Sequence, residues 1–409
     1  MKKSQLLNEI MGVPKAVDFW VDYFSIIIVG AAKGLVSKED IEVSPALEYV
    51  DEEGNTKTAE GYRAITKIEK KEFMNWVLKI GGYANLKDLM TDSRFQQFPL
   101  YNPSVTIALY FLPQELYDLE FANRKDGTDF VEASHALDTT KKALSKVGKN
   151  QVFVNQKFTF QIYLPISELE NLDTENLRKQ IKPTISHELT HAYESFNRVF
   201  KSGDPYQGRE TFLNTAIRLM QDDKYPQWRY FLHLVYLHLS FELNARVTQF
   251  YYSIKDKDVK NLDDFMMLLK QNSAWKELKM LEDFDAEKFI QSFQMKRGES
   301  FFDMIEDLGK QIDRERQGLP MIKMAKTPEQ GMKHLIQGWD QVLQMLNLQL
   351  KSQGLYKGKL MDLVPQKAIN DPYYFFKFFE KRFRKKAERF KKKLYNISTL
   401  VLDKSLMED

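Results

Sequence analysis

Residues 185–194 read Ile-Ser-His-Glu-Leu-Thr-His-Ala-Tyr-Glu, and this stretch decides how the rest of the chain is interpreted. His187 and His191 are four residues apart, so on an α-helix both imidazoles project from one face and can bind one metal ion. Glu188 follows His187 directly, where its carboxylate can reach a water at that metal. The opposite side carries an apolar stripe at helical spacing: Ile185, Leu189, Ala192, Phe196 and Val199. The pattern predicts a helix with one buried face and one face toward a cleft.

Two histidines do not complete a zinc site, because a catalytic zinc usually takes three protein ligands and keeps a fourth position open. A third histidine six residues after His191 is excluded, since that residue is Asn197. A carboxylate on a later helix is the remaining option. Glu242 lies near the end of the segment 228–243, which is apolar nearly all round. The whole segment, with Glu242, is therefore expected to be buried. A buried carboxylate costs several kcal/mol unless it is paired or metal-bound, which favours Glu242 as the third ligand. The alternative is an ion pair with Arg246, four residues on.

Composition excludes several classes of protein. The chain has 409 residues, a formal charge of +3 and no cysteine. The near balance of charge excludes a global attraction to nucleic acid or membranes, and the lack of cysteine excludes disulfides, thiolate nucleophiles and cysteine-bound zinc. The apolar run Phe24–Ala32 is too short to cross a bilayer and is followed by Lys33. We therefore expect a soluble protein with no transmembrane segment and no recognised signal peptide, whose compartment stays unassigned.

Hydrophobic periodicity predicts an α+β protein that is predominantly helical. Before the histidine motif, the patterns indicate a helix at 73–80 that ends at Gly81-Gly82, and strands at 41–50, 63–68, 105–112 and 152–164. After it, helices are expected at 183–200 (beginning at Pro183), 226–252, 261–271, 285–296, 299–316, 328–352 and 373–395. The expected organisation is an α+β region at 1–150, a core at 151–260 and a helical region at 261–409.

The last of these helices is basic and amphipathic. Residues 377–393 contain ten lysines and arginines, and apolar residues recur through them at helical spacing. The simplest interpretation is a packed apolar stripe with a solvated charged face. The alternative is contact with an anionic partner, either nucleic acid, a membrane surface or an acidic protein.

The two histidines with the Glu-x-x-Ala segment at 242–245 resemble the gluzincin branch of the zincin metallopeptidases, over about residues 150–255. The resemblance implies a zincin-like core: a mixed sheet, then the motif helix, then a helical lobe with the third ligand. It implies that His187, His191 and Glu242 bind Zn²⁺ and that Glu188 is the general base. It also places strand 152–164 at the sheet edge that aligns a peptide substrate by strand addition. Many gluzincins have an acidic residue four positions after the ligand glutamate, where this chain has Arg246.

A further donor is needed to stabilise the oxyanion of peptide hydrolysis. His238 is the catalytic candidate, because it lies four residues before Glu242 on the same helix face; a ligand role, a supporting role and a structural role are the alternatives. His233 is off that face and is interpreted as structural. Glu194 shares the histidine face and is expected to support the site or be solvated. Weaker donor candidates are Tyr193, Tyr206 and Arg209.

These residues predict a zinc-dependent peptidase that hydrolyses a polypeptide substrate. The alternative is a structural or assembly protein, such as a component of a phage virion, that carries a metallopeptidase-like domain, active or degenerate. It is motivated by the long flanking regions without an enzymatic signature and by the basic aromatic helix, and it implies protein assembly partners. A third option is a metal site that serves folding alone.

Overall fold

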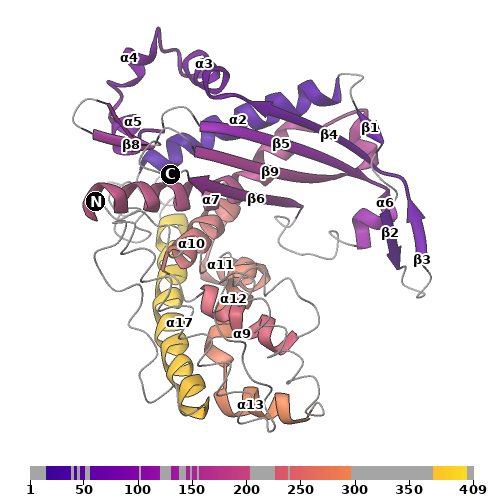
Figure 1. Ribbon diagram of the computed structural model, residues 1–409, viewed down its shortest axis with the longest axis vertical. Helices are drawn as coiled ribbons and strands as arrows, with labels where there is room; N and C mark the ends of the chain where they lie inside the picture. The colour runs from indigo at the N-terminus through magenta and orange to yellow at the C-terminus, as the bar shows by residue number, and fades with distance from the viewer. Residues whose placement is uncertain are drawn as a thin grey trace, which may run out of the picture. The chain divides into compact units, whose positions relative to one another are not determined.

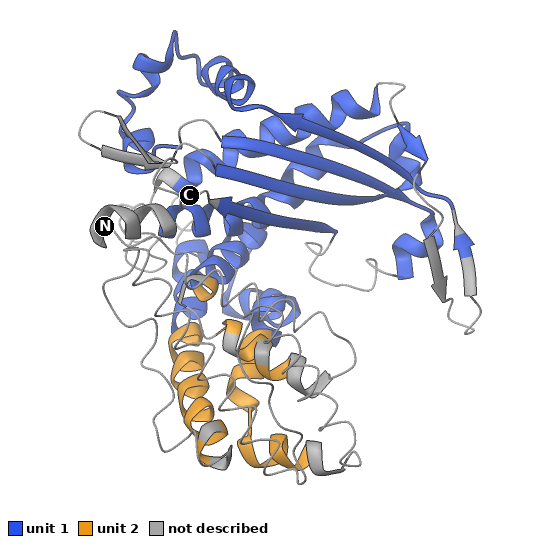
Figure 2. Ribbon diagram, in the orientation of Figure 1, with its two compact units in different colours: residues 1–200, 244–276, 392–409 blue, residues 201–243, 277–391 orange. Residues whose placement is uncertain are grey.

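The computed structural model describes residues 15–37, 41–43, 47–50, 56–100, 103–119, 130–137, 144–147, 150–153, 156–202, 226–237, 240–295 and 372–402. Within them the chain is mostly helical and contains a mixed five-stranded sheet, which confirms the α+β class (Figure 1). The chain divides into two compact units: unit 1 is residues 1–200, 244–276 and 392–409, and unit 2 is residues 201–243 and 277–391 (Figure 2). Both units are thus discontinuous in sequence, and the three regions expected above stay a prediction.

Unit 1 contains the five-stranded sheet, with strand order β1-β4-β5-β9-β6. The strands are β1 (Glu42–Val43), β4 (Tyr62–Ile68), β5 (Pro103–Leu112), β6 (Val131–Leu137) and β9 (Gln156–Pro165). β9 runs parallel to β5, whereas β4 is antiparallel to β5 and β6 is antiparallel to β9. Two separate hairpins pair β2 (Leu47–Val50) with β3 (Thr56–Ala59) and β7 (Leu144–Val147) with β8 (Asn150–Phe153). β3 was not expected from the sequence.

The strand expected at 152–164 needs two corrections. Residues 150–153 belong to β8, so β9 itself begins only at Gln156. β9 is also not at the sheet edge, because β5 pairs with one side and β6 with the other. Its alternating pattern arises because Phe158, Phe160 and Ile162 are buried on one face of the sheet. Alternation reports one buried face and not the number of neighbouring strands.

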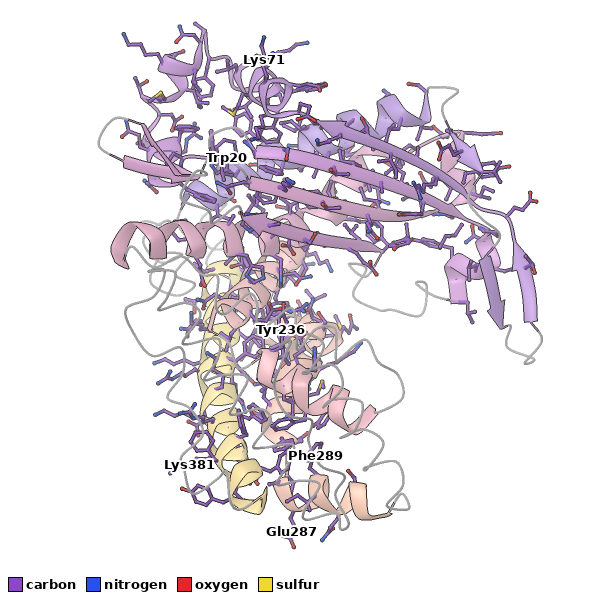
Figure 3. The ribbon with its side chains drawn as sticks, in the orientation of Figure 1. Trp20, Lys71, Tyr236, Glu287, Phe289 and Lys381 are labelled. Carbon is purple, nitrogen blue, oxygen red and sulfur yellow. The ribbon has the colours of Figure 1, made fainter. Side chains whose placement is uncertain are left out.

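Helix α2 (Lys15–Val36) is packed into the core of unit 1. Trp20 and Phe24 are fully buried, and the Phe24 ring lies 4.9 Å from that of Phe158 in β9. Figure 3 labels Trp20 among the side chains of this unit. Its indole N–H donates a 2.8 Å hydrogen bond to the carbonyl of Phe98. By length and composition alone, Val17–Val36 could cross a membrane. The run Phe24–Ala32 was therefore too short a segment from which to exclude a membrane span. More than half of that segment is buried inside the protein, and core helices meet the same criterion.

Shorter elements follow α2. Helix α3 (Lys70–Gly81) ends as expected, with Gly82 at a φ of 69° as its C-cap, a conformation that glycine adopts without strain. The remaining elements before the histidine motif are α4 (Leu86–Leu89), α5 (Ser93–Gln97), α6 (Gln114–Tyr117) and the 3₁₀ helix η3 (Ile166–Leu169).

Helix α7 (Thr174–Ser202) carries the histidine motif and begins earlier than expected. Its first turn is capped by Asp173, which accepts a 3.0 Å hydrogen bond from the Asn176 backbone N–H. Pro183, the expected first residue, lies inside the helix and removes one backbone hydrogen bond. The buried stripe extends through it, since Leu177 and Ile181 join Ile185 and Leu189 as core residues. Burial of this stripe on both sides of Pro183 offsets the lost bond.

Two helices replace the single helix expected at 226–252: α9 (Pro226–Leu237) and α10 (Ser240–Ile254). The helices expected at 261–271, 285–296 and 373–395 are confirmed as α11 (Leu262–Gln271), α13 (Ala286–Met295) and α17 (Pro372–Leu402). Helix α12 (Ser273–Asp283) was not expected. The expected helices at 299–316 and 328–352 lie outside the described residues.

Unit 2 has an aromatic core of its own. The ring of Phe231 in α9 lies 5.5 Å from Phe289 in α13 and 5.0 Å from Phe376 in α17 (Figure 3). The apolar stripe of α17 is therefore buried as expected, while Lys381 and Arg384 on its charged side are exposed. Contact of this charged side with an anionic partner stays a prediction.

Replacing Trp20 by Phe should destabilise the protein by about 1–3 kcal/mol, because it leaves the buried Phe98 carbonyl without its hydrogen bond. Urea unfolding followed by circular dichroism measures the change. Trp76→Phe is the matched control, because Trp76 is 36% exposed. Equal unfolding midpoints for the two variants would contradict this account of the core.

Asp92 should make the fold sensitive to acid. It caps α5 and accepts hydrogen bonds from the Arg94 guanidinium at 2.7 Å and the Tyr83 hydroxyl at 2.7 Å. The Arg94 side-chain hydrogen bonds hold the pKa of Asp92 far below its usual value; burial is the next largest effect and opposes them, and the Tyr83 hydrogen bond lowers the pKa further. A lowered folded-state pKa gives stability that is present above the unfolded pKa of about 3.9 and is lost as the pH falls further. Between pH 6 and pH 3, Asp92→Asn should therefore lose less stability than the wild-type protein in urea unfolding; parallel losses would show that Asp92 does not contribute.

Candidate metal centre

The two motif histidines meet on one face of α7, as the sequence predicted. The His187 side chain is buried and that of His191 is half-buried. Their ring centroids are 4.7 Å apart with the rings nearly perpendicular, and the two Nε2 atoms are 3.0 Å apart. The two nitrogens that could ligate a metal thus converge on one point.

Glu242 in α10 joins this pair. Its side chain is fully buried, and its carboxylate and the ligating nitrogens of His187 and His191 all lie within 4.8 Å of one another. Although unit 2 includes Glu242, the boundary falls inside α10, between Leu243 and Asn244, so most of this helix belongs to unit 1 with α7. All three residues predicted as ligands are brought together.

The donor set fits zinc. Two imidazole nitrogens and one carboxylate oxygen are typical ligands of a catalytic zinc ion. Zinc–ligand bonds of about 2.1 Å in a tetrahedron place ligand atoms about 3.4 Å apart, close to the 3.0 Å between the two Nε2 atoms. The remaining separations are at most 4.8 Å. Three protein ligands leave a fourth position for water or substrate.

Gln249 contacts His187 from the side opposite the cluster. Its Oε1 lies 3.1 Å from His187 Nδ1, and the Arg246 guanidinium donates to the same oxygen at 3.4 Å. The sequence analysis did not identify Gln249. A signal existed, because Gln249 follows Glu242 by seven residues and so lies on the same face of α10 two turns later.

Asn244 provides a second link between α7 and α10. Its side-chain N–H donates to the Glu194 carboxylate, and its carbonyl oxygen accepts a hydrogen bond from Lys393 in α17. Glu194 thus has a hydrogen-bond partner in α10, and its supporting role at the site stays a prediction. Burial lowers the pKa of Lys393, and the nearby Glu194 opposes this effect. Asn244 lies two residues after Glu242 and Glu194 three residues after His191, so their hydrogen bond fixes how the two turns that carry the predicted ligands face each other.

His135 in β6 is a second imidazole near the pair on α7. It lies opposite Phe158 of β9, with ring centroids 4.7 Å apart, on the face of the sheet that the helices cover. Burial, and secondly the charge of His191, lower the pKa of His135 to about 3, so it is neutral at physiological pH. Its Nε2 atom is buried without a hydrogen bond to the described residues, while a side-chain interaction of the ring with Gln156 opposes the lowering of the pKa. Sequence analysis missed its proximity because the pairing of β6 with β9 is long-range.

The remaining predicted residues fall into two groups. Glu188 is buried on α7, beside His187 in the chain. Tyr193 packs edge-on against Phe98 at 5.4 Å, and His233 lies beside Tyr236 in α9, so both have structural contacts. Those outside the described residues are His238, Tyr206 and Arg209.

The wild-type protein should bind about one zinc ion per chain, and His187→Ala, His191→Ala and Glu242→Gln should each weaken binding by more than about 100-fold. Competition with a chromophoric chelator measures the affinity, and elemental analysis measures the stoichiometry. His233→Ala is the control, because His233 lies outside the cluster. If Glu242→Gln binds zinc as tightly as wild type, the ion pair with Arg246 becomes the better account of Glu242.

Comparisons with known proteins found no relative of this chain. No family model matches the chain, and neither the curated proteins nor the solved structures contain a match. The assignment of the site consequently depends on the residues and distances above.

Proposed function

We propose that the chain is a zinc-dependent peptidase with a zincin-like core of the gluzincin kind. The observation that carries the proposal is the convergence of His187, His191 and the buried Glu242 within 4.8 Å, with Glu188 next to His187 on the same helix. The mixed sheet that precedes α7 supports the proposed fold. Zn²⁺ is the proposed cofactor, because this donor set suits it and no cysteine is present.

The proposed mechanism assigns each residue one task. His187, His191 and Glu242 would hold the metal, and zinc bound there supplies a Lewis acid that lowers the pKa of water to about 7 and polarises the scissile carbonyl. Glu188 accepts the proton of the attacking water on its carboxylate and then transfers it to the nitrogen of the leaving amine. The burial of Glu188 strengthens these electrostatic interactions by limiting competing water.

A separate hydrogen-bond donor is required for the developing oxyanion. The sequence assigns this task to His238, which stays a prediction. His135 is the alternative within the described part of the chain, because its Nε2 is buried without a hydrogen bond there and lies near His191.

The position of β6 at the edge of the sheet favours a polypeptide as the substrate. Among the described strands, β6 pairs with β9 alone, so its other side presents backbone N–H and C=O groups. An extended peptide can add to such an edge by main-chain hydrogen bonds. The proposed substrate-aligning strand is thus β6, the correction that follows from the interior place of β9.

Glu188→Gln should lower the rate of hydrolysis by about 10²–10⁴-fold, the range for loss of a general base, while zinc is retained. Hydrolysis of an unfolded protein substrate, measured beside zinc content, tests this. Glu175→Gln is the matched control, because Glu175 lies in the first turn of α7 and is exposed.

Two results would count against the peptidase assignment. Full activity in Glu188→Gln would remove Glu188 as the base. A zinc-loaded wild-type protein that hydrolyses none of a panel of unfolded proteins would favour the assembly protein with a degenerate metallopeptidase-like domain.

A further inference from the structure

We propose that Gln249 is a positioning residue that fixes the tautomer and ring orientation of His187, and that it does so as a neutral amide backed by the Arg246 guanidinium. This inference rests on the proposed metal site. It names a residue and a charge arrangement that the motif itself does not contain.

The first step is the position of the proton on His187. Its Nδ1 lies 3.1 Å from Gln249 Oε1. A carbonyl oxygen only accepts hydrogen bonds, so Nδ1 must carry the proton. In the neutral ring the lone pair is then on Nε2, the atom that lies 3.0 Å from His191 Nε2 and in the cluster with Glu242. The contact therefore presents the correct nitrogen for ligation.

The second step is the orientation of the amide, because oxygen and nitrogen of a glutamine are distinguished only by their partners. Arg246 approaches the same atom of Gln249 at 3.4 Å. A guanidinium has donors and no acceptor, so the atom that faces both Arg246 and His187 Nδ1 must be the oxygen. Arg246 therefore assigns the oxygen, and His187 Nδ1 must then be the donor to it.

The third step is the charge of this arrangement. Metal-binding histidines usually donate their second N–H to a carboxylate or a carbonyl, and a carboxylate partner makes the imidazole a more basic ligand. Gln249 orients His187 without adding negative charge, and Arg246 adds a positive charge beside it. Glu242 is then the single anionic member of the three-residue cluster. We therefore expect the amide to orient His187 while leaving metal affinity below the value that a carboxylate would give.

Zinc affinity of the full chain tests the proposal. Gln249→Leu keeps the approximate size of the side chain, removes the acceptor and should weaken zinc binding by about 10–100-fold. Gln249→Glu restores an acceptor and adds negative charge, so it should bind zinc more tightly than wild type. Gln271→Leu, an exposed glutamine at the end of α11, is the control and should leave the affinity unchanged. Gln249→Met replaces Gln249→Leu if the latter does not fold.

Nuclear magnetic resonance of the metal-free protein measures the tautomer of His187, which would not change if Gln249 had only a structural role. The His187 ring should carry a proton on Nδ1 in wild type and in Gln249→Glu, and the population with this tautomer should fall in Gln249→Leu. Wild-type affinity and an unchanged His187 tautomer in Gln249→Leu would overturn the proposal. If wild type binds no zinc, the proposed function fails, whereas the tautomer still decides whether Gln249 positions His187.

Discussion

The contact between α7 and α10 is the constraint on which the rest of the site depends. It places a fully buried carboxylate, Glu242, beside the imidazoles of His187 and His191. Removal of a carboxylate from water costs several kcal/mol unless it is paired or metal-bound. A divalent cation shared by all three residues would offset this cost, because it is attracted to the carboxylate and accepts both nitrogen lone pairs. The burial that is unfavourable for the carboxylate alone is what makes the cluster suited to a metal.

Segments far apart in sequence hold this contact in place. The Asn244–Glu194 hydrogen bond joins α10 to α7, and Lys393 from the C-terminal helix bonds to Asn244. His135 approaches the same region from β6. The site thus draws on residues on both sides of the stretch 151–260 that carries the motif. Residues 392–409, which include Lys393, belong to unit 1, although they follow the end of unit 2 in the chain.

The sequence could predict those parts of the site that local periodicity determines. Histidines four residues apart must share a helix face, and the apolar surroundings of Glu242 indicate burial, so both were placed correctly. Local patterns do not record which strand lies beside another, which is why β9 was expected at the edge and His135 had no visible role. Pro183 was expected to begin a helix because proline suits a first turn, yet tertiary burial of Leu177 and Ile181 extended α7 beyond it. The spacing of Gln249 places it on the Glu242 face of α10, but its contact with His187 arises only from the packing of α10 against α7, which local patterns do not record.

Arg246 connects the two interpretations of Glu242. A guanidinium and a divalent cation compete to neutralise one carboxylate, because two cations close together repel each other strongly in a buried site. The contact of Arg246 with Gln249 directs at least one of its N–H groups to the amide that orients His187. In that position its N–H group turns the amide oxygen of Gln249, and not the amide nitrogen, toward His187 Nδ1. In the arrangement we propose, Arg246 and Gln249 together orient His187 without a carboxylate.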